Sequence, residues 1–114
     1  MEDDSMTQPE LYRHLSDIGL PLAYKSFDED NFDDIPSPPF LVYLFSYSND
    51  LIADNANYVD VSYFQVELYT DKKDLVNEKK VEDKLKEIEM PYFKQEFWIP
   101  SERLHQVIYE ITLI

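Results

Sequence analysis

The feature that most constrains the fold is a change of hydrophobic period between residues 58 and 89. From Tyr58 to Tyr69, apolar side chains alternate with polar ones, which is the period of a strand. Thr70 and Asp71 follow, and we predict that they cap a helix running to about Glu89. The apolar stripe of that helix consists of Val81, Leu85 and Ile88, with Leu75 near its edge. The strand, predicted to be the longest, therefore leads directly into a helix that must pack on its own sheet.

Charged residues fill the rest of this predicted helix. They are Glu78, Lys79, Lys80, Glu82, Lys84, Lys86 and Glu87. Opposite charges four residues apart on a helix attract each other, so pairs such as Glu82 with Lys86 are expected on a solvated face. Lys72 and Lys73, which precede the helix, are also expected to be solvated.

The strand alternation slips once. Val59, Val61 and Tyr63 share one parity, and Phe64, Val66 and Leu68 share the other. One interpretation is a β-bulge near Ser62–Tyr63, because an extra residue reverses the faces of the side chains after it. The other is a strand covered on both faces. Both interpretations suit a sheet that is used in assembly.

The N-terminal part predicts a short helix. Thr7 is the expected N-cap, Gly19 has the place of a left-handed C-cap, and Pro21 stops the helix. One face of this helix carries Leu11, His14, Leu15 and Ile18. Residues 1–6 are expected to be disordered, and Leu22–Phe27 is a candidate first strand.

Three further strands and one loop are predicted. Phe40–Tyr47 is apolar on both faces, as in an interior strand. Ser48–Asn57 predicts a polar loop that exposes the two apolar residues Leu51 and Ile52. Tyr92–Ile99 and Arg103–Ile114 predict the last two strands, joined by a turn at Pro100–Ser101.

The order of elements is therefore α-β-β-β-α-β-β. Strands joined by short connections favour an antiparallel arrangement. The length of 114 residues fits one domain. We predict a single α+β domain over residues 1–114, with a mainly antiparallel sheet and two flanking helices.

Composition excludes several classes of function. The chain has one glycine and no cysteine, so glycine-rich phosphate loops, disulfides and thiolate chemistry are excluded. The net charge is −14, which argues against binding the outside of a nucleic-acid duplex or an anionic membrane. No apolar run reaches the length of a membrane span and no signal sequence is recognisable, so we predict a protein assembled in a cytosol.

No residue pattern indicates catalysis, cofactor binding or a metal centre. His14 and His105 stand at no ligand spacing from another histidine. The acidic segment Asp28–Asp34 has Phe32 where a calcium loop needs an oxygen ligand, and no glycine follows. We therefore predict a protein that is not an enzyme, with no catalytic, cofactor-binding or metal-binding residues.

Two segments resemble a known family. The strand-to-helix junction Tyr63–Asp74, YFQVELYTDKKD, is followed by a Lys/Glu-rich helix, and Tyr92–Ile114 then leads through a Ser-Glu turn into a VIYE strand. This part of the chain resembles small tail completion or tail terminator proteins, which join head and tail in tailed bacteriophages and prophages of Gram-positive bacteria. The resemblance covers roughly Pro39 to Ile114.

The resemblance implies a structural virion protein with no catalytic residues. Such proteins form a ring, commonly a hexamer, that ends the tail tube and contacts the major tail tube protein and the head connector or stopper. It implies a location at the head–tail junction after assembly in the host cytoplasm. Specific nucleic-acid or membrane binding is not expected. The predicted interface residues are Leu51, Ile52, Asp54, Asn55, Tyr63 and Tyr69.

One alternative belongs to a different class. A charge of −14 also suits a small acidic phage inhibitor that mimics DNA and blocks a host nuclease. Such a mimic needs regularly spaced solvent-facing carboxylates. The acids of this chain instead gather in the N-terminus, in Asp28–Asp34 and in a helix that also carries many lysines.

Overall fold

The computed structural model describes residues 6–27, 35–48, 51–53, 56–59 and 61–113, a range that leaves out Asp28–Asp34. The elements in chain order are α1 (Gln8–Ser16), β1 (Leu22–Tyr24), β2 (Phe40–Ser48), β3 (Leu51–Ala53), β4 (Ala56–Val59), β5 (Ser62–Thr70), α2 (Leu75–Glu87), β6 (Phe93–Ile99) and β7 (Leu104–Leu113). A five-stranded sheet has the order β1-β2-β5-β7-β6. Helices and sheet strands follow the predicted order α-β-β-β-α-β-β, so the α+β fold is confirmed.

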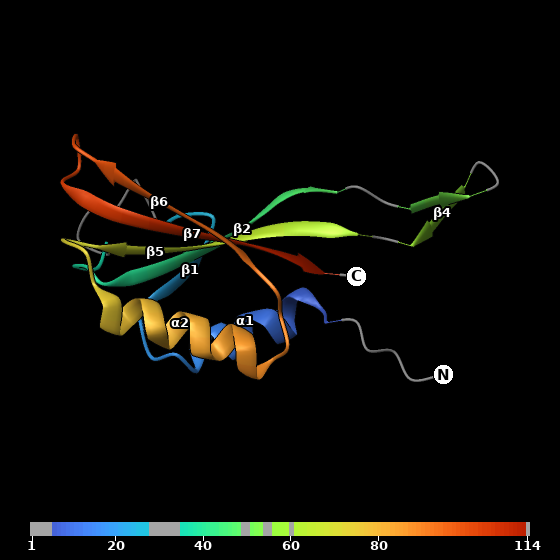
Figure 1. The fold of residues 1–114 in the computed structure, drawn as a ribbon, viewed down its shortest axis with the longest axis horizontal. Helices are drawn as coiled ribbons and strands as arrows, with labels where there is room; N and C mark the ends of the chain where they lie inside the picture. Colours follow the sequence, from blue (N-terminus) through green and yellow to red (C-terminus); the bar gives the residue numbers. More distant parts are fainter. Residues whose placement is uncertain (1–5, 28–34, 49–50, 54–55, 60, 114) are drawn as a thin grey trace.

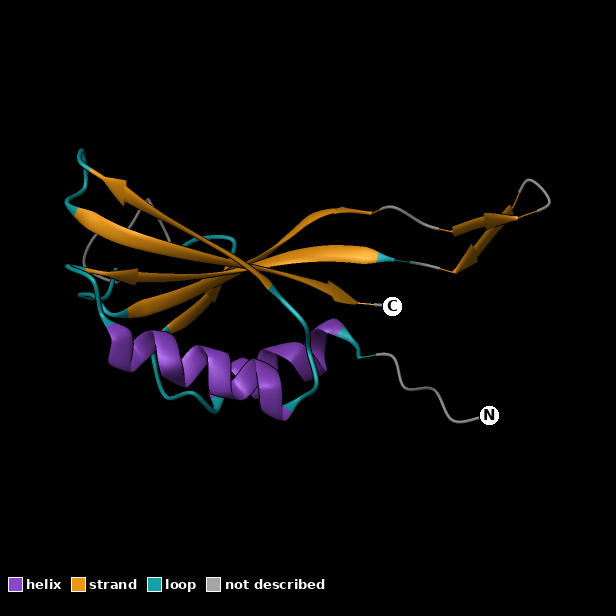
Figure 2. Cartoon of the chain, in the orientation of Figure 1, coloured by secondary structure: helices purple, strands orange, loops and turns teal. Residues whose placement is uncertain are grey.

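The molecule has two layers. Both helices lie on one face of the sheet (Figure 1), and Figure 2 shows no helix on the opposite face among the described residues. We call the face without helices the open face. Within the sheet β1 and β2 are parallel, and every other neighbouring pair is antiparallel. The prediction of a mainly antiparallel sheet is confirmed.

The core lies between the helices and the sheet. Leu11 and Leu15 come from α1, and Val81 and Leu85 from α2, each with 0% exposure. The sheet contributes Leu41, Tyr43, Phe64, Val66, Leu68, Val107, Tyr109, Ile111 and Leu113. Burying an aliphatic side chain of this size stabilises the fold by about 1.5–3 kcal/mol before the entropy of ordering it is subtracted.

The first helix begins as predicted. The Thr7 side-chain oxygen accepts a 3.3 Å hydrogen bond from the backbone N–H of Glu10. The helix ends at Ser16, and Gly19 then takes a left-handed φ of 93°, a conformation that favours glycine. Ahead of the helix, Met6 already packs against the core.

The start of the second helix differs from the prediction. Thr70 is the last residue of β5, and its hydroxyl donates to the Lys72 carbonyl oxygen at 2.6 Å. The N-cap is Asp74, whose Oδ1 accepts from the backbone N–H of Asn77 at 3.0 Å. The prediction of Thr70 and Asp71 as caps is therefore wrong. Thr70 still belongs to β5, and two residues, Lys72 and Lys73, lie between Asp71 and the N-cap.

The faces of α2 also differ from the prediction. Leu75, expected near the apolar stripe, has 69% of its surface exposed. Glu78, expected on the solvated face, has 2% exposed. The helix turns Glu78 toward the sheet because lysines from two other segments meet its carboxylate there.

The region before β5 is a hairpin and not a loop. Within the predicted loop Ser48–Asn57, Leu51–Ala53 forms β3 and pairs antiparallel with β4. The predicted strand Tyr58–Tyr69 is thereby split between β4 and β5, and β7 is the longest strand with 10 residues. The β3–β4 hairpin projects beyond the end of the main sheet (Figure 1).

The β-bulge lies in the neighbouring strand. Phe45 pairs with Phe64 and Tyr47 pairs with Tyr63, so the extra residue is Ser46 on β2. The other neighbour, β7, pairs with β5 without interruption. The predicted bulge near Ser62–Tyr63 is therefore wrong, because the extra residue of this ladder belongs to β2 and β5 itself continues without a shift.

Candidate functional site

The open face carries a row of exposed aromatic side chains. Opposite residues of an antiparallel pair share a face, so the registers place Phe93 and Phe97 of β6 on the same face as Tyr63 and Tyr69 of β5. Phe93 is 78% exposed and Phe97 is 47% exposed. Apolar groups gathered on one sheet face indicate a contact surface.

The β2 bulge brings a further aromatic ring to this face. Phe45, before the bulge, lies on the helix side and packs edge-on against Phe64. The extra residue reverses the parity, so Tyr47 faces the open side and stacks on Tyr63 with ring centroids 4.4 Å apart. The irregularity thus aims Tyr47 at the candidate surface.

Tyr69 is fixed at the other end of the open face. Its hydroxyl donates to Glu67 at 2.7 Å and accepts from the Gln106 amide at 2.8 Å. Burial, followed by the hydrogen bond to Glu67, raises the pKa of Tyr69 well above its ordinary value. Phe40 stacks on the Tyr69 ring at 5.1 Å. Tyr69 is therefore held rigidly in place.

A groove of about 860 Å³ lies at this end of the open face. Its apolar lining includes Phe27, Ile35, Phe40, Val42, Tyr69 and Leu104. Lys25 and Arg103 stand beside it with Asp71 and Glu102, so both signs of charge surround an apolar floor. This composition suits a protein segment, since apolar area and mixed polar groups are typical of protein contacts.

The strand β6 is an edge of the sheet. Six of its seven residues are exposed, and beyond the pairing with β7 it has no neighbour among the described strands. Charged residues on an edge normally discourage further pairing. Here Lys94 and Glu96 turn to the helix side and form ion pairs there. The exposed aromatics Phe93, Phe97 and Trp98 remain along this edge.

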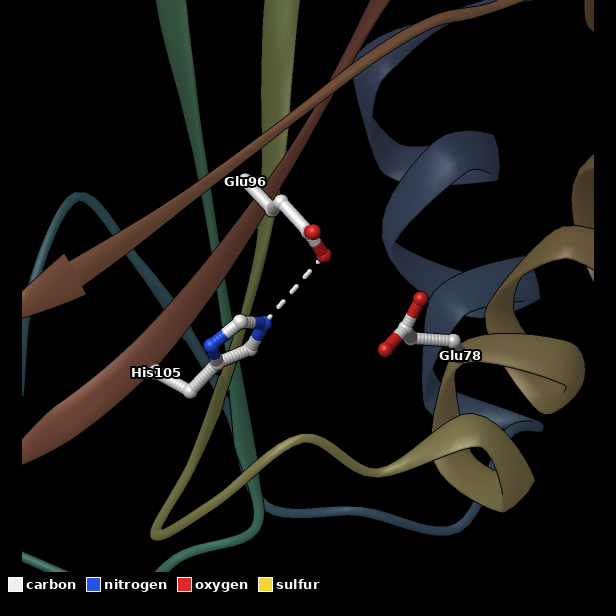
Figure 3. A group of neighbouring side chains, drawn as sticks. All are labelled: Glu78, Glu96 and His105. Atoms are coloured by element: carbon white, nitrogen blue, oxygen red, sulfur yellow. Dashed lines mark ion pairs between the residues drawn. The ribbon is translucent and has the colours of Figure 1, made fainter.

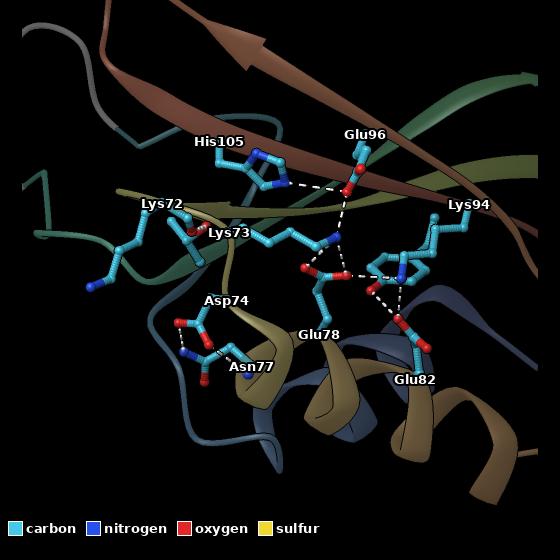
Figure 4. A network of polar contacts seen from close by, with 11 residues as sticks. Lys72, Lys73, Asp74, Asn77, Glu78, Glu82, Lys94, Glu96 and His105 are labelled. Carbon is cyan, nitrogen blue, oxygen red and sulfur yellow. Dashed lines mark hydrogen bonds and ion pairs between the residues drawn. The ribbon is translucent and has the colours of Figure 1, made fainter.

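A polar network joins α2 to the sheet on the other face (Figure 4). Oε1 of the buried Glu78 accepts from Lys73 at 3.0 Å and lies 2.8 Å from the Lys94 ammonium. Lys73 also donates to Glu96. Hydrogen bonds to Glu96 and Glu78 raise the pKa of Lys73, and those to Glu78 and Glu82 raise the pKa of Lys94. Both lysines are therefore cations at neutral pH.

Glu82 continues the network by one helical turn. Its Oε2 lies 2.9 Å from the Lys94 ammonium and accepts from the Tyr109 hydroxyl at 2.7 Å. Burial alone would raise the pKa of the Glu82 carboxyl, but the hydrogen bonds from Lys94 and Tyr109 outweigh it and lower that pKa. Glu82 was predicted to pair with Lys86 along the helix, and its observed partners instead come from the sheet.

The two histidines of the chain lie in different elements. His14 lies in α1, between the buried Leu11 and Leu15. His105 lies in β7 with its Nε2 atom 3.4 Å from Glu96 Oε2. Figure 3 shows the Glu78 carboxylate facing this pair from α2. Because the three residues come from α2, β6 and β7, no short spacing in the sequence could have indicated the cluster.

The predicted interface residues are only partly brought together. Tyr63 and Tyr69 share the open face, whereas Leu51 and Ile52 belong to the β3 strand of the projecting hairpin. Asp54 and Asn55 lie outside the described residues. Phe93 and Phe97 were not predicted as interface residues. They stand four residues apart in the predicted strand Tyr92–Ile99, so the sequence already indicated that they share a face.

Comparison with known proteins gives no assignment. No protein-family model matches the chain, and no curated protein matches it. Among the described residues, no helix is both long enough and apolar enough to cross a membrane.

Proposed function

We propose that this protein is a structural virion protein of a tailed bacteriophage, which assembles into a ring at the head–tail junction and ends the tail tube. The observation that carries the proposal is the open face, where Tyr47 of β2 and Phe93 and Phe97 of β6 are exposed, and where β6 has β7 as its one neighbour among the described strands. The phage assignment itself comes from the resemblance of residues 39–114 to tail completion proteins.

Burial on assembly accounts for these exposed residues. Exposed aromatic side chains on one face of a sheet, with an edge strand, are typical of a surface that contacts another protein. In a ring each copy presents two different surfaces, one to each neighbour. The open face with β6 supplies one such surface, and its neighbour covers it in the assembled ring.

The charge supports a ring over a DNA mimic. A lumen rich in carboxylates repels the DNA backbone and lets the genome slide through. A mimic needs free carboxylates, but several acids of α2 are paired with lysines. Lys79 lies 2.7 Å from Asp83, and Lys84 lies 2.6 Å from Glu87. The helix therefore presents both signs of charge to its surroundings.

The β3–β4 hairpin is the proposed contact with the tail tube or the connector. Among the described strands, β3 and β4 pair with each other and with no strand of the main sheet, and the hairpin projects away from that sheet (Figure 2). Leu51 and Ile52 lie in β3 and supply the apolar residues for this contact. An arm of this kind reaches a neighbouring protein without disturbing the core.

Mass photometry and light scattering at high concentration test the proposal, with the protein alone and mixed with the tail tube protein of the same phage. A closed ring, formed alone or on the tube, is the expected result. Replacing Leu51 and Ile52 together by Asp should impair assembly on the tube and leave the circular-dichroism spectrum unchanged. A strict monomer under both conditions would contradict the ring, and full assembly of the double variant would contradict the role of the hairpin.

A further inference from the structure

Three potential metal ligands from separate elements meet on the helix side of the sheet. Glu78 of α2, Glu96 of β6 and His105 of β7 each offer one ligand atom, and the three atoms lie within 4.8 Å of one another. Figure 3 shows the two carboxylates and the imidazole turned toward a common centre. The cluster takes no part in the open face or in the hairpin, so the proposed ring function does not account for it.

Two of these atoms lack hydrogen bonds although they are buried. They are Oε2 of Glu78 and Nε2 of His105. Glu78 is 2% exposed, and its other oxygen, Oε1, already receives Lys94. The Glu78 Oε2 atom lies 3.0 Å from the Lys73 ammonium, close enough for an ion pair but without hydrogen-bond geometry. His105 Nε2 likewise lies 3.4 Å from Glu96 Oε2 without forming a hydrogen bond. Buried polar atoms without a hydrogen bond are rare in native proteins, and a bound ion is one explanation for them.

Lys73 provides the positive charge at the centre of the cluster. Its ammonium contacts both Glu78 and Glu96, and its side chain is 44% exposed. A flexible, half-exposed lysine can swing into solvent. A divalent cation in its place would neutralise both carboxylates, while Lys94 keeps its contact with Glu78 Oε1. The site therefore suits exchange of an ammonium for a metal ion.

The ligand types select the class of metal. Two carboxylate oxygens and one imidazole nitrogen are ligands for Zn²⁺ and similar first-row ions, whereas Ca²⁺ and Mg²⁺ prefer oxygen ligands alone. At zinc–ligand distances of about 2.1 Å, tetrahedral ligands lie about 3.4 Å apart. The Glu96–His105 distance is 3.4 Å. Only Glu78 has to approach, because the three ligand atoms lie within 4.8 Å of one another and a tetrahedral ion holds its ligands about 3.4 Å apart.

We propose that Glu78, Glu96 and His105 bind one Zn²⁺ or similar transition-metal ion, with water as the fourth ligand, in competition with the Lys73 ammonium. The ion clamps α2 to β6 and β7. No short sequence motif marks such a site, because the sheet register and the position of α2 bring together ligands that are far apart in the sequence.

Calorimetry with Zn²⁺ tests the site, in the presence of excess Mg²⁺ to occupy non-specific acidic positions. Absorption spectra with Co²⁺ report tetrahedral coordination. We expect one ion per chain, binding weakened at least tenfold in His105→Gln, and binding tightened several-fold in Lys73→Met, which removes the competing cation. His14→Gln and Lys79→Met are matched controls and should leave the affinity unchanged.

Several results would overturn the proposal. They are binding of several ions with equal weak affinity, equal loss of binding in His14→Gln and His105→Gln, or an affinity that Lys73→Met leaves unchanged or lowers. Circular dichroism shows whether each variant is folded. If His105→Gln does not fold, Lys73→Met decides alone: tighter binding supports the site, and unchanged or weaker binding overturns it.

Discussion

The hydroxyl of Tyr109 donates a 2.7 Å hydrogen bond to Oε2 of Glu82, and this contact joins the last strand to the second helix. The Tyr109 side chain is fully buried. Burial, with the hydrogen bond to Glu82 adding to it, raises the pKa of Tyr109 well above its ordinary value. The hydroxyl therefore stays protonated at neutral pH and can donate this hydrogen bond.

Replacing Tyr109 by Phe removes this donor and keeps the ring in the core. A hydrogen bond to a charged group contributes about 1.5–3 kcal/mol, and Glu82 keeps its contact with Lys94, so we expect a loss of about 1.5 kcal/mol. Urea unfolding measures it. Tyr92→Phe is the matched control, since the Tyr92 hydroxyl reaches Glu82 only at 3.4 Å, and should cost less than about 0.5 kcal/mol. Equal losses would contradict the special role of Tyr109.

The N-cap Asp74 should make the stability depend on pH. Hydrogen bonds from the backbone N–H and then the side chain of Asn77 lower the pKa of the Asp74 carboxyl. A carboxyl with a lower pKa in the folded state adds stability above its unfolded pKa of about 4, and this stability is lost as the pH falls through the folded pKa.

The measurement compares wild type with Asp74→Asn, which retains a capping oxygen but does not titrate. The difference in unfolding free energy between the two proteins should shrink as the pH falls from about 6 to about 3. Asp74→Ala should cost about 1 kcal/mol at neutral pH, which is typical of a lost N-cap. A difference that stays constant with pH would contradict the assignment.

Local patterns in the sequence predicted the helices and the strands of the main sheet in their correct order, but long-range contacts determine the other features of the structure. Thr7 caps α1 as expected because the signal lies within one helical turn. The burial of Glu78 was not predicted because a glutamate is rarely buried without a charged partner, although helix periodicity places it on the same side as Val81 and Leu85. It depends on Lys73 and on Lys94 of β6, and an unpaired carboxylate at that position would be strongly destabilising.

For the open face and the hairpin, too, local sequence patterns predicted some features and long-range contacts determine the others. Tyr63 and Tyr69 share a face because they belong to one strand, and parity alone predicts that. Tyr47 joins them only because of the bulge at Ser46 of β2, whereas the sequence pattern predicted a bulge near Ser62–Tyr63 of β5. The β3–β4 hairpin was not predicted because its strands are short and the sequence around them is polar, a composition that is also typical of a loop.

Two leucines of α2 provide a test of the helix orientation. Leu85 is completely buried and Leu75 is 69% exposed. Leu85→Ala should cost about 2–5 kcal/mol because it leaves a cavity in the core. Leu75→Ala should change the stability by less than about 0.5 kcal/mol. Thermal and urea unfolding measure both, and similar effects would mean that α2 packs through a different face.

The exposed aromatic residues of the open face should be needed for assembly. Replacing Phe93 and Phe97 together by Thr keeps a good strand residue at each position but removes both exposed rings. We expect the concentration needed for ring formation to rise at least about tenfold, since aromatic anchors commonly dominate such interfaces. Val76→Thr, at a site in α2 that is 70% exposed, is the matched control. Mass photometry follows the rings, and circular dichroism verifies the fold. Unchanged assembly of the folded double variant would exclude the open face as the contact between copies and leave the projecting hairpin as the remaining proposed contact.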